Sequence, residues 1–296
     1  MSDEIHFYAP GLKGYRTSEY ASQDAGAFVS LSVTGASCAL QCDHCQSRVL
    51  EGMIPLNGGG LFEQARALAE RGTRGILVSG GCDKRGRVPL LRHMDDLKRI
   101  RTELGLAIRV HPGLPDEETA AALGEIDLDG AMLDIIGAEE TIREVYHLEA
   151  GVDEYAAVLE RLSRHGVPLV PHIILGLHYG RMLGEWRALD MIARHRPKLL
   201  VLIILMPLYG TAMATVTTPS VEEIGAFFRT AREAFPDIPV SLGCARPIGP
   251  QKTAIDRLAI DAGLDGIAYP AEGIVAYARE RGRTPRFHDA CCGVNW

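Results

Sequence analysis

The chain repeats one order of features: an amphipathic run with apolar residues three or four positions apart, a glycine, and a short apolar run rich in β-branched residues. Residues 67–80 (ALAERGTRGILVSG) and 162–176 (LSRHGVPLVPHIILG) show it clearly, and 101–113 and 260–270 repeat it. The spacing of three or four is typical of a helix packed on a core, and glycine readily ends such a helix. The β-branched run indicates a buried strand, so the pattern predicts an α/β protein.

The apolar runs between these helices predict eight strands. They lie near residues 28–34, 75–79, 106–111, 130–135, 168–175, 199–205, 239–243 and 265–269. Helices are expected between them, for example over 90–104 and over 220–235, where Ser220 and Glu223 form a capping box. Alternation of strand and helix predicts a parallel sheet, and eight repeats favour a closed (β/α)8 TIM-type barrel over an open doubly wound sheet.

Length and composition support one large domain. The chain has 296 residues, of which 47% are hydrophobic, enough for one large core. The strand-helix repeat covers a barrel at 28–283, with an N-terminal extension at 1–27 and a C-terminal tail at 284–296. The net charge of -7, without a dense Lys/Arg run, argues against nucleic acid as a partner. The N-terminus has no signal-peptide pattern and the longest apolar run, 199–208, is about half a membrane span, so we expect a cytoplasmic protein with no membrane partner.

Cysteine usage points to metal or redox chemistry. The chain has seven cysteines, unevenly placed, and is too large to need a disulfide framework. Cys38, Cys42 and Cys45 lie in SCALQCDHCQ, just past the first predicted barrel strand, where barrel enzymes build their sites. Three thiolates can hold an iron-sulfur cube whose fourth iron stays open to a substrate. The alternatives are a zinc site that adds His44, or buried cysteines without a ligand.

The Cys-x3-Cys-x2-Cys motif after the first strand resembles the radical S-adenosylmethionine (SAM) superfamily, and the chain resembles its biotin synthase branch over nearly the whole barrel. The resemblance implies a radical SAM barrel with a 4Fe-4S cluster on the three cysteines and SAM bound beside it. The SAM contacts that it implies are Ser79, Gly80 and Gly81 for the amino group, Asp134 for the ribose, Ile173 and Gly176 for the adenine, and Gly210 in the loop after strand six. Each match alone is also ordinary turn chemistry, and Asp134 would equally well cap a helix.

Departures from biotin synthases concern their second, sulfur-donating cluster. Arg109 and Val170 stand where that branch has cysteines on strands three and five, which disfavours biotin formation. The arginine of strand seven has a match in Arg246 of SLGCAR. Cys244 stands two residues before it, and Cys82 replaces the glutamate that many members have after strand two.

The remaining cysteines raise the possibility of a second cluster. A tail folded over the barrel mouth would bring Cys291 and Cys292 to Cys82 and Cys244, and this set is the candidate ligand group of a second iron-sulfur cluster. Alternatively, Cys82 and Cys244 are small buried apolar residues, and the tail cysteines form an exposed redox pair. Three histidines near predicted strand ends, His111, His172 and His178, are more typical of hydrogen-bonded structural residues than of a proton relay.

Several motifs together resemble one protein of the two-component lipoyl synthase system. They are FYAPGLKGY, SGGCDKRGRVPL, IREVYHLEA, HIILGLHYG, SLGCARP and the terminal CCG. The resemblance implies sulfur insertion into a protein-bound octanoyl chain. Its implied partners are a sister radical SAM protein, an octanoylated lipoyl carrier domain or H protein, and an electron donor such as ferredoxin or flavodoxin. The alternatives are another radical enzyme of this branch, such as a mutase, methylase or metal-cofactor maturase, and a non-catalytic iron-sulfur redox protein.

Overall fold

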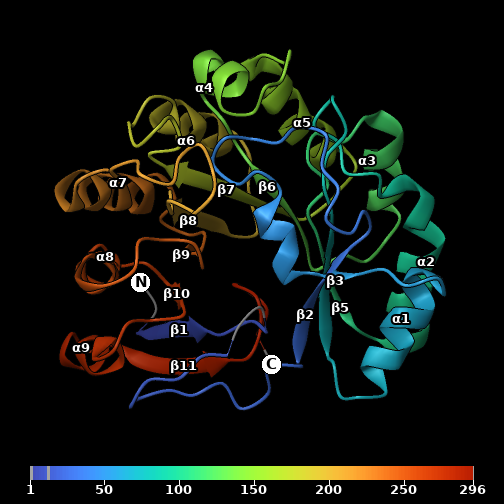
Figure 1. Cartoon of the computed structure of the whole chain (residues 1–296). Coiled ribbons are helices and arrows are strands. Elements are labelled where there is room, and N and C mark those ends of the chain that lie inside the picture. Colours follow the sequence, from blue (N-terminus) through green and yellow to red (C-terminus); the bar gives the residue numbers. More distant parts are fainter. Residues whose placement is uncertain (1–2, 12–13, 296) are drawn as a thin grey trace.

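The computed structural model describes residues 3–11 and 14–295. Within them, eleven parallel strands form one sheet that curls into a half-barrel, with helices covering its outer face (Figure 1). The strands are β1 Glu4–Tyr8, β2 Phe28–Ser32, β3 Ile54–Pro55, β4 Gly75–Ser79, β5 Ala107–Val110, β6 Gly130–Asp134, β7 Leu169–Leu175, β8 Leu200–Ile204, β9 Val240–Leu242, β10 Gly266–Ala268 and β11 Thr284–His288. The α-helices are α1 Gly60–Ala69, α2 Met94–Arg99, α3 Glu117–Gly124, α4 Glu139–Glu144, α5 Val152–Arg164, α6 Glu185–Ala193, α7 Val221–Ala234, α8 Pro250–Asp261 and α9 Ile274–Glu280.

All eight strands expected from the sequence are confirmed, as β2 and β4 to β10. Helix α7 also begins as expected, because the Glu223 N–H donates to the Ser220 hydroxyl at 3.2 Å and the Ser220 N–H to the Glu223 carboxylate at 3.0 Å. The single helix expected over 90–104 is wrong. The 3-10 turn η2 Leu91–His93, α2 and the π-helical η3 Ile100–Leu104 replace it. Leu91, which the periodicity put on the buried face, is 38% exposed, whereas Met94 and Leu97 are buried.

The expected closure of the barrel is also wrong. The strand order runs β11-β1-β10-β9-β8-β7-β6-β5-β4-β2-β3, so β11 and β3 are the edges. Strands β1 and β11 take the place beside β10 where β2 would have to pair to close the barrel. Gly11, after β1, donates its N–H to the Phe28 carbonyl at 3.0 Å, and a side chain at Gly11 would lie 1.7 Å from the Ala25 carbonyl oxygen. The segments predicted as an N-terminal extension and a tail therefore both supply strands to the sheet.

The end of the chain fills the lower interior of the half-barrel rather than covering its mouth. Ala290 and Val294 are buried with Phe28, the first residue of β2. A side chain at Gly293 would lie 2.7 Å from Leu199, just before β8. The tail thus lies toward the amino ends of the strands, and the predicted position over the mouth is wrong. Among the described residues, no helix is long and apolar enough to cross a membrane.

Candidate functional site

The cysteine loop follows β2 at the carboxyl end of the strands. Cys42 and Cys45 are buried and Cys38 is half-buried. Gln41, Gln46 and Ser47 all have positive φ, at 50°, 44° and 64°. Side chains other than glycine rarely adopt this backbone conformation, and it recurs where a fold must hold a functional group in place. These bends keep Cys42 and Cys45 on one side of the loop, and the Cys45 N–H donates to the Cys42 carbonyl at 3.0 Å.

Asp43, between two of the cysteines, anchors the loop to its neighbours. Its carboxylate accepts from Tyr179 at 2.5 Å and lies 2.9 Å from Nε2 of His147, and its N–H donates to Val145 at 3.0 Å. These partners follow β6 and β7, on the far side of the interior from β2. The sequence carries no signal for this role of Asp43, because none of these contacts is local in the chain.

The hydrogen bond between Cys42 and Cys45 shifts their pKa values in opposite directions, raising that of Cys42. A hydrogen bond from Cys42 lowers the pKa of Cys45 well below its usual value, and a second one from His44 acts in the same direction. Burial would lower the pKa of His44, but its hydrogen bond to Cys45 and the charges of Cys45, Asp134 and Asp43 together outweigh burial, and the pKa is raised. The Cys82 N–H donates to Cys38 Sγ at 3.4 Å. Thiolate is the form that binds iron or zinc, so this donor set fits an iron-sulfur cluster.

The glycine turn after β4 packs directly on the cysteine loop. The Gly81 N–H donates to the Thr34 hydroxyl at 2.7 Å. A Cβ atom at Gly81 would lie 2.0 Å from the Ser37 carbonyl oxygen and 2.5 Å from the Cys38 Cα, so only glycine fits. Ser79 and Gly80 precede it, and the Ser79 hydroxyl donates to the His111 carbonyl at 3.1 Å. The turn that was predicted to contact the amino group of SAM, residues 79–81, therefore lies against Cys38.

Strand β6 ends at Asp134, which faces the interior beside two of the three histidines noted in the sequence. Asp134 Oδ2 lies 3.7 Å from His111 Nε2, and His172 is its register partner on β7. Burial would raise the pKa of Asp134, but the hydrogen bond and charge of His111 lower it to about 2. His178 lies elsewhere, 3.2 Å from the Thr141 hydroxyl.

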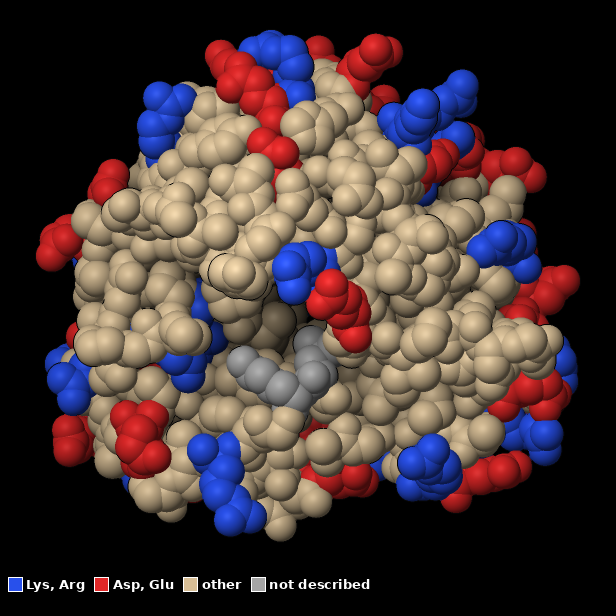
Figure 2. Space-filling model, viewed as in Figure 1, with Lys and Arg blue, Asp and Glu red and all other residues tan. Residues whose placement is uncertain are grey.

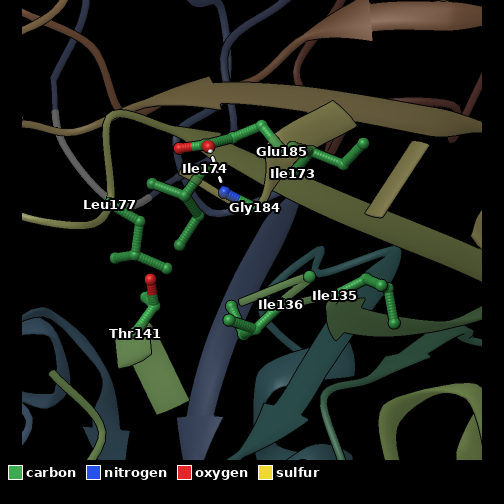
Figure 3. Close-up of a pocket in the computed structure, with 9 residues that line it drawn as sticks. Ile135, Ile136, Thr141, Ile173, Ile174, Leu177, Gly184 and Glu185 are labelled. Atoms are coloured by element: carbon green, nitrogen blue, oxygen red, sulfur yellow. Dashed lines mark hydrogen bonds between the residues drawn. The ribbon is translucent and has the colours of Figure 1, made fainter. Parts of the chain in front are cut away.

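A small cavity between the ends of β6 and β7 is lined by Ile135, Ile136, Ile173, Ile174 and Leu177 (Figure 3). Next to it the buried carboxylate of Glu185 accepts backbone N–H groups of Gly176 at 2.8 Å and Gly184 at 2.9 Å. Burial raises the pKa of Glu185, against the opposing effect of these backbone bonds. Glu185 fixes the Gly176 turn, in which φ is +78°.

Strand alternation decides which isoleucine of β7 faces the interior. His172 lies at the inner face with Asp134, so Ile174 shares that face, and it is partly exposed. Ile173 points the other way and is only 1% exposed. The adenine contact expected at Ile173 therefore fits the side chain of Ile174 better.

The loop after β8 reaches the short helix η1 Arg48–Gly52, which follows the cysteine loop. Gly210 has a φ of +78°, and a side chain there would lie 2.3 Å from Nη1 of Arg48. The adjacent Tyr209 is 91% exposed. Figure 2, drawn from the same side as Figure 1, shows a hollow near the middle of the face turned to the viewer. The hollow lies beside the position that η1, in light blue, has in Figure 1. The predicted SAM contacts therefore all lie at the ends of strands or in the loops that follow them, around one mouth.

The family model of the radical SAM superfamily matches residues 32–181, about half of the chain, from the end of β2 past the end of β7. The chain belongs to the radical SAM superfamily. This membership implies a 4Fe-4S cluster and SAM as cofactors, and it favours the cluster over the zinc alternative. A search of curated protein sequences gave no match.

Three solved structures illustrate how widely the fold is shared. Methylornithine synthase (PylB) has a TM-score of 0.60 and 14% identity, over 96% of this chain and 84% of that chain. The FeFe-hydrogenase maturase HydG from Carboxydothermus hydrogenoformans has a TM-score of 0.62 and 15% identity, over 96% and 68%. Streptococcus suis SuiB bound to S-adenosylmethionine has a TM-score of 0.55 and 10% identity, over 77% and 52%. Identities this low show the fold alone.

The four cysteines outside the radical SAM motif do not form one group. Cys82 lies against the motif loop, and burial, followed by the charge of Cys38, raises its pKa to about 12. Burial raises the pKa of Cys291 to about 11 and that of Cys292 further, and the nearby Cys244 adds to both shifts. The structure thus associates Cys244 with Cys291 and Cys292, and Cys82 with the motif loop, because the tail enters the half-barrel from the amino ends of the strands.

Two buried arginines flank the tail group and differ in their partners. Arg246 is held by Asp256 at 2.7 Å and by the carbonyl oxygens of Gly243 and Tyr269 at 2.8 and 2.9 Å, so its role is structural. Arg109 is 0% exposed and donates to the Cys292 carbonyl at 3.2 Å. Its Nε and Nη1 have no hydrogen-bond partner among the described residues.

Proposed function

We propose that this radical SAM protein is an enzyme that removes a hydrogen atom from an unactivated carbon of a substrate held inside the half-barrel. The observation that carries the proposal is the packing of the Gly81 turn on the loop of Cys38, Cys42 and Cys45, at the mouth. No general base can remove such a hydrogen, so the cofactors must supply a radical and the protein must supply position and exclusion of water.

The residues at the mouth would each bind a different part of the cofactors. The three thiolates would hold the 4Fe-4S cluster, which with SAM would supply a radical able to remove hydrogen. The backbone from Ser79 to Gly81 would bind the amino group of SAM, and Asp134 the ribose hydroxyls. Ile174 and the Gly176 turn would contact the adenine, and Gly210 allows the loop after β8 to approach η1. All of these residues lie near strand ends or in the loops that follow them, so the sheet holds them rigidly around the mouth.

The more specific proposal is sulfur insertion into an octanoyl chain. Cys244, Cys291 and Cys292 offer three thiols at the inner surface, and Arg109 places a buried cation beside them. A buried cation without an anionic partner is costly, whereas an iron-sulfur cluster on thiolates carries negative charge. This donor set fits a second cluster, which would supply sulfur to the substrate carbon. Cys82 is not part of this set.

The proposed partners follow from the resemblance to two-component lipoyl synthases. They are a sister radical SAM protein, an octanoylated carrier domain or H protein, and a ferredoxin or flavodoxin as electron donor. Exposed apolar side chains on loops after β8 and β9, Tyr209 at 91% and Ile248 at 81%, provide contact area for a carrier at the mouth.

A second candidate is radical rearrangement or maturation chemistry without sulfur donation. It is supported by the similarity of fold to a methylornithine synthase and to a hydrogenase maturase, each over 96% of this chain. In this case Arg109 would meet an anionic group of the substrate, and the tail cysteines would serve only packing.

Two variants test these proposals after anaerobic reconstitution. Replacing Cys38, Cys42 and Cys45 together by Ala should abolish formation of 5′-deoxyadenosine while the circular dichroism spectrum stays that of a folded α/β protein. Retained cleavage of SAM in this variant would remove the radical assignment.

The second variant, Cys291→Ala with Cys292→Ala, separates the two candidates. Under sulfur insertion, iron falls from about eight to about four per chain. The variant still forms 5′-deoxyadenosine, and an octanoylated carrier peptide with the sister protein present gains no sulfur. If the unaltered protein holds only about four irons, and the variant keeps them all, the second candidate is correct.

A further inference from the structure

Three side chains from neighbouring strands meet inside the half-barrel, apart from the cysteines. His111 follows β5, Asp134 ends β6 and His172 lies on β7. Each offers one ligand atom, and the three atoms lie within 4.8 Å of one another. The rings of the two histidines are 6.2 Å apart at an interplanar angle of 31°. Asp134 and His172 are register partners on neighbouring parallel strands, and His111 directly follows the next strand, so the arrangement depends on the rigid sheet and not on a flexible loop.

The burial of this trio and the ligand atoms that it offers suit a cation. His172 is 4% exposed, and its Nδ1 has no hydrogen-bond partner among the described residues. Imidazole nitrogens and carboxylate oxygens are ligand groups that divalent first-row metal ions accept.

Within the described residues, the only ion-pair partner of Asp134 within 4.0 Å is His111, and no Lys or Arg is that close. A carboxylate that faces two imidazoles, one with an unused ring nitrogen, is poorly satisfied by hydrogen bonds alone. In the sequence alone, both histidines are typical of hydrogen-bonded structural residues. Their meeting with Asp134 appears only when β5, β6 and β7 are side by side.

We propose that His111, Asp134 and His172 bind one divalent first-row transition-metal ion, at a site separate from the cysteine ligands. Two histidines and one carboxylate on one side of an ion leave its other coordination positions open. Those positions would face the interior and accept an oxygen or sulfur atom of a substrate. The proposal goes beyond the radical SAM function, and the trio shares no residue with either cysteine group. It shares Asp134 with the proposed ribose contact: Oδ2, which faces His111 at 3.7 Å, would bind the ion, and Oδ1 would serve the ribose.

The test uses Mn2+ as the probe, because manganese prefers oxygen and nitrogen ligands to thiolates. The reconstituted protein is titrated with Mn2+ without oxygen, and unbound Mn2+ is followed by its electron paramagnetic resonance signal. We expect one Mn2+ per chain. His172→Ala and His111→Ala should each weaken binding at least about tenfold. His178→Gln is the matched control, because this buried histidine lies outside the trio, and it should bind as the unaltered protein does.

The outcome separates this site from the proposed function. The variant without Cys38, Cys42 and Cys45 should still bind Mn2+, although it forms no 5′-deoxyadenosine. Zn2+ should displace the bound Mn2+, because it binds such ligands more tightly. If Mn2+ remains unbound, or if the histidine variants bind it as well as the control, the trio is not a metal site. The radical assignment would then stand unchanged.

Discussion

Removing the end of the chain after Asp289 should destabilise the fold, although residues 290–295 belong to no helix or strand. The truncation deletes Ala290, Cys292 and Val294, which are 0%, 7% and 6% exposed. Burial of these three side chains contributes roughly 4 kcal/mol, at about 0.8 kcal/mol per buried methylene and about 2 for valine. Arg109 also loses its bond to the Cys292 carbonyl, which adds about 1 kcal/mol.

The total of roughly 5 kcal/mol is a large part of the stability of a typical domain. It corresponds to a fall of roughly 10–15 °C in Tm, which differential scanning calorimetry measures directly. Asp289 remains in the truncated chain, with its bonds from the Gln23 and Asp24 N–H groups at 2.9 and 3.0 Å, so β11 keeps its anchor.

The full-length variant Cys291→Ala with Cys292→Ala is the control, because it keeps Val294 and the backbone carbonyl that Arg109 contacts. It should lose only roughly 2 kcal/mol, or about 5 °C. If the truncated chain melts within about 3 °C of the unaltered protein, the tail does not pack inside the half-barrel. The association of its cysteines with Cys244 would then fail as well.

Three further changes test single contacts. Asp134→Ala should weaken SAM binding by about 1–3 kcal/mol in calorimetric titration with the cluster intact, and unchanged affinity would limit Asp134 to the fold or the metal site. Asp256→Asn should cost about 3–5 kcal/mol in urea unfolding, because Arg246 would stay buried without its anion, and a loss below about 1 kcal/mol would contradict the ion pair. Burial lowers the pKa of His6, whose Nδ1 lies 2.9 Å from Nε2 of His288. The folded state therefore binds fewer protons than the unfolded one, and stability is lost as the pH falls below about 6.5. Tm should then drop less on acidification in His6→Gln, and an equal drop would show that His6 does not titrate with folding.

The pattern of the sequence was sufficient for most of the fold. Eight strands were predicted because each is a mostly apolar run bounded by glycine or proline, as expected for strands buried on both faces. Strands β1 and β11 were missed because EIHFY and TPRFH alternate polar and apolar residues outside the strand-helix repeat. Whether a curled sheet closes depends on which strands occupy its last positions, and that is a contact between chain ends far apart in sequence.

The radical SAM motif was also readable, because a cluster loop is short and its cysteines are close in the chain. The glycines after β4 and β7 were identified by position, although the atoms that require glycine at Gly81, in Ser37 and Cys38, belong to another loop. Ile173 was chosen over Ile174 because the alternation of a strand does not say which face is inside.

The sequence by itself therefore determined what is local: the strand-helix alternation, the helix caps, and the three thiolates of one loop. Only the tertiary structure decided which distant groups share the interior. It associated Cys244 with the tail and Cys82 with the motif loop, left Arg109 buried beside the tail, and brought His111, Asp134 and His172 together. The physical reason is that a parallel sheet sets neighbouring strands about 4.8 Å apart whatever their separation along the chain. Side chains that carry no shared pattern in the sequence then meet because the backbone hydrogen bonds of the sheet hold their strands side by side.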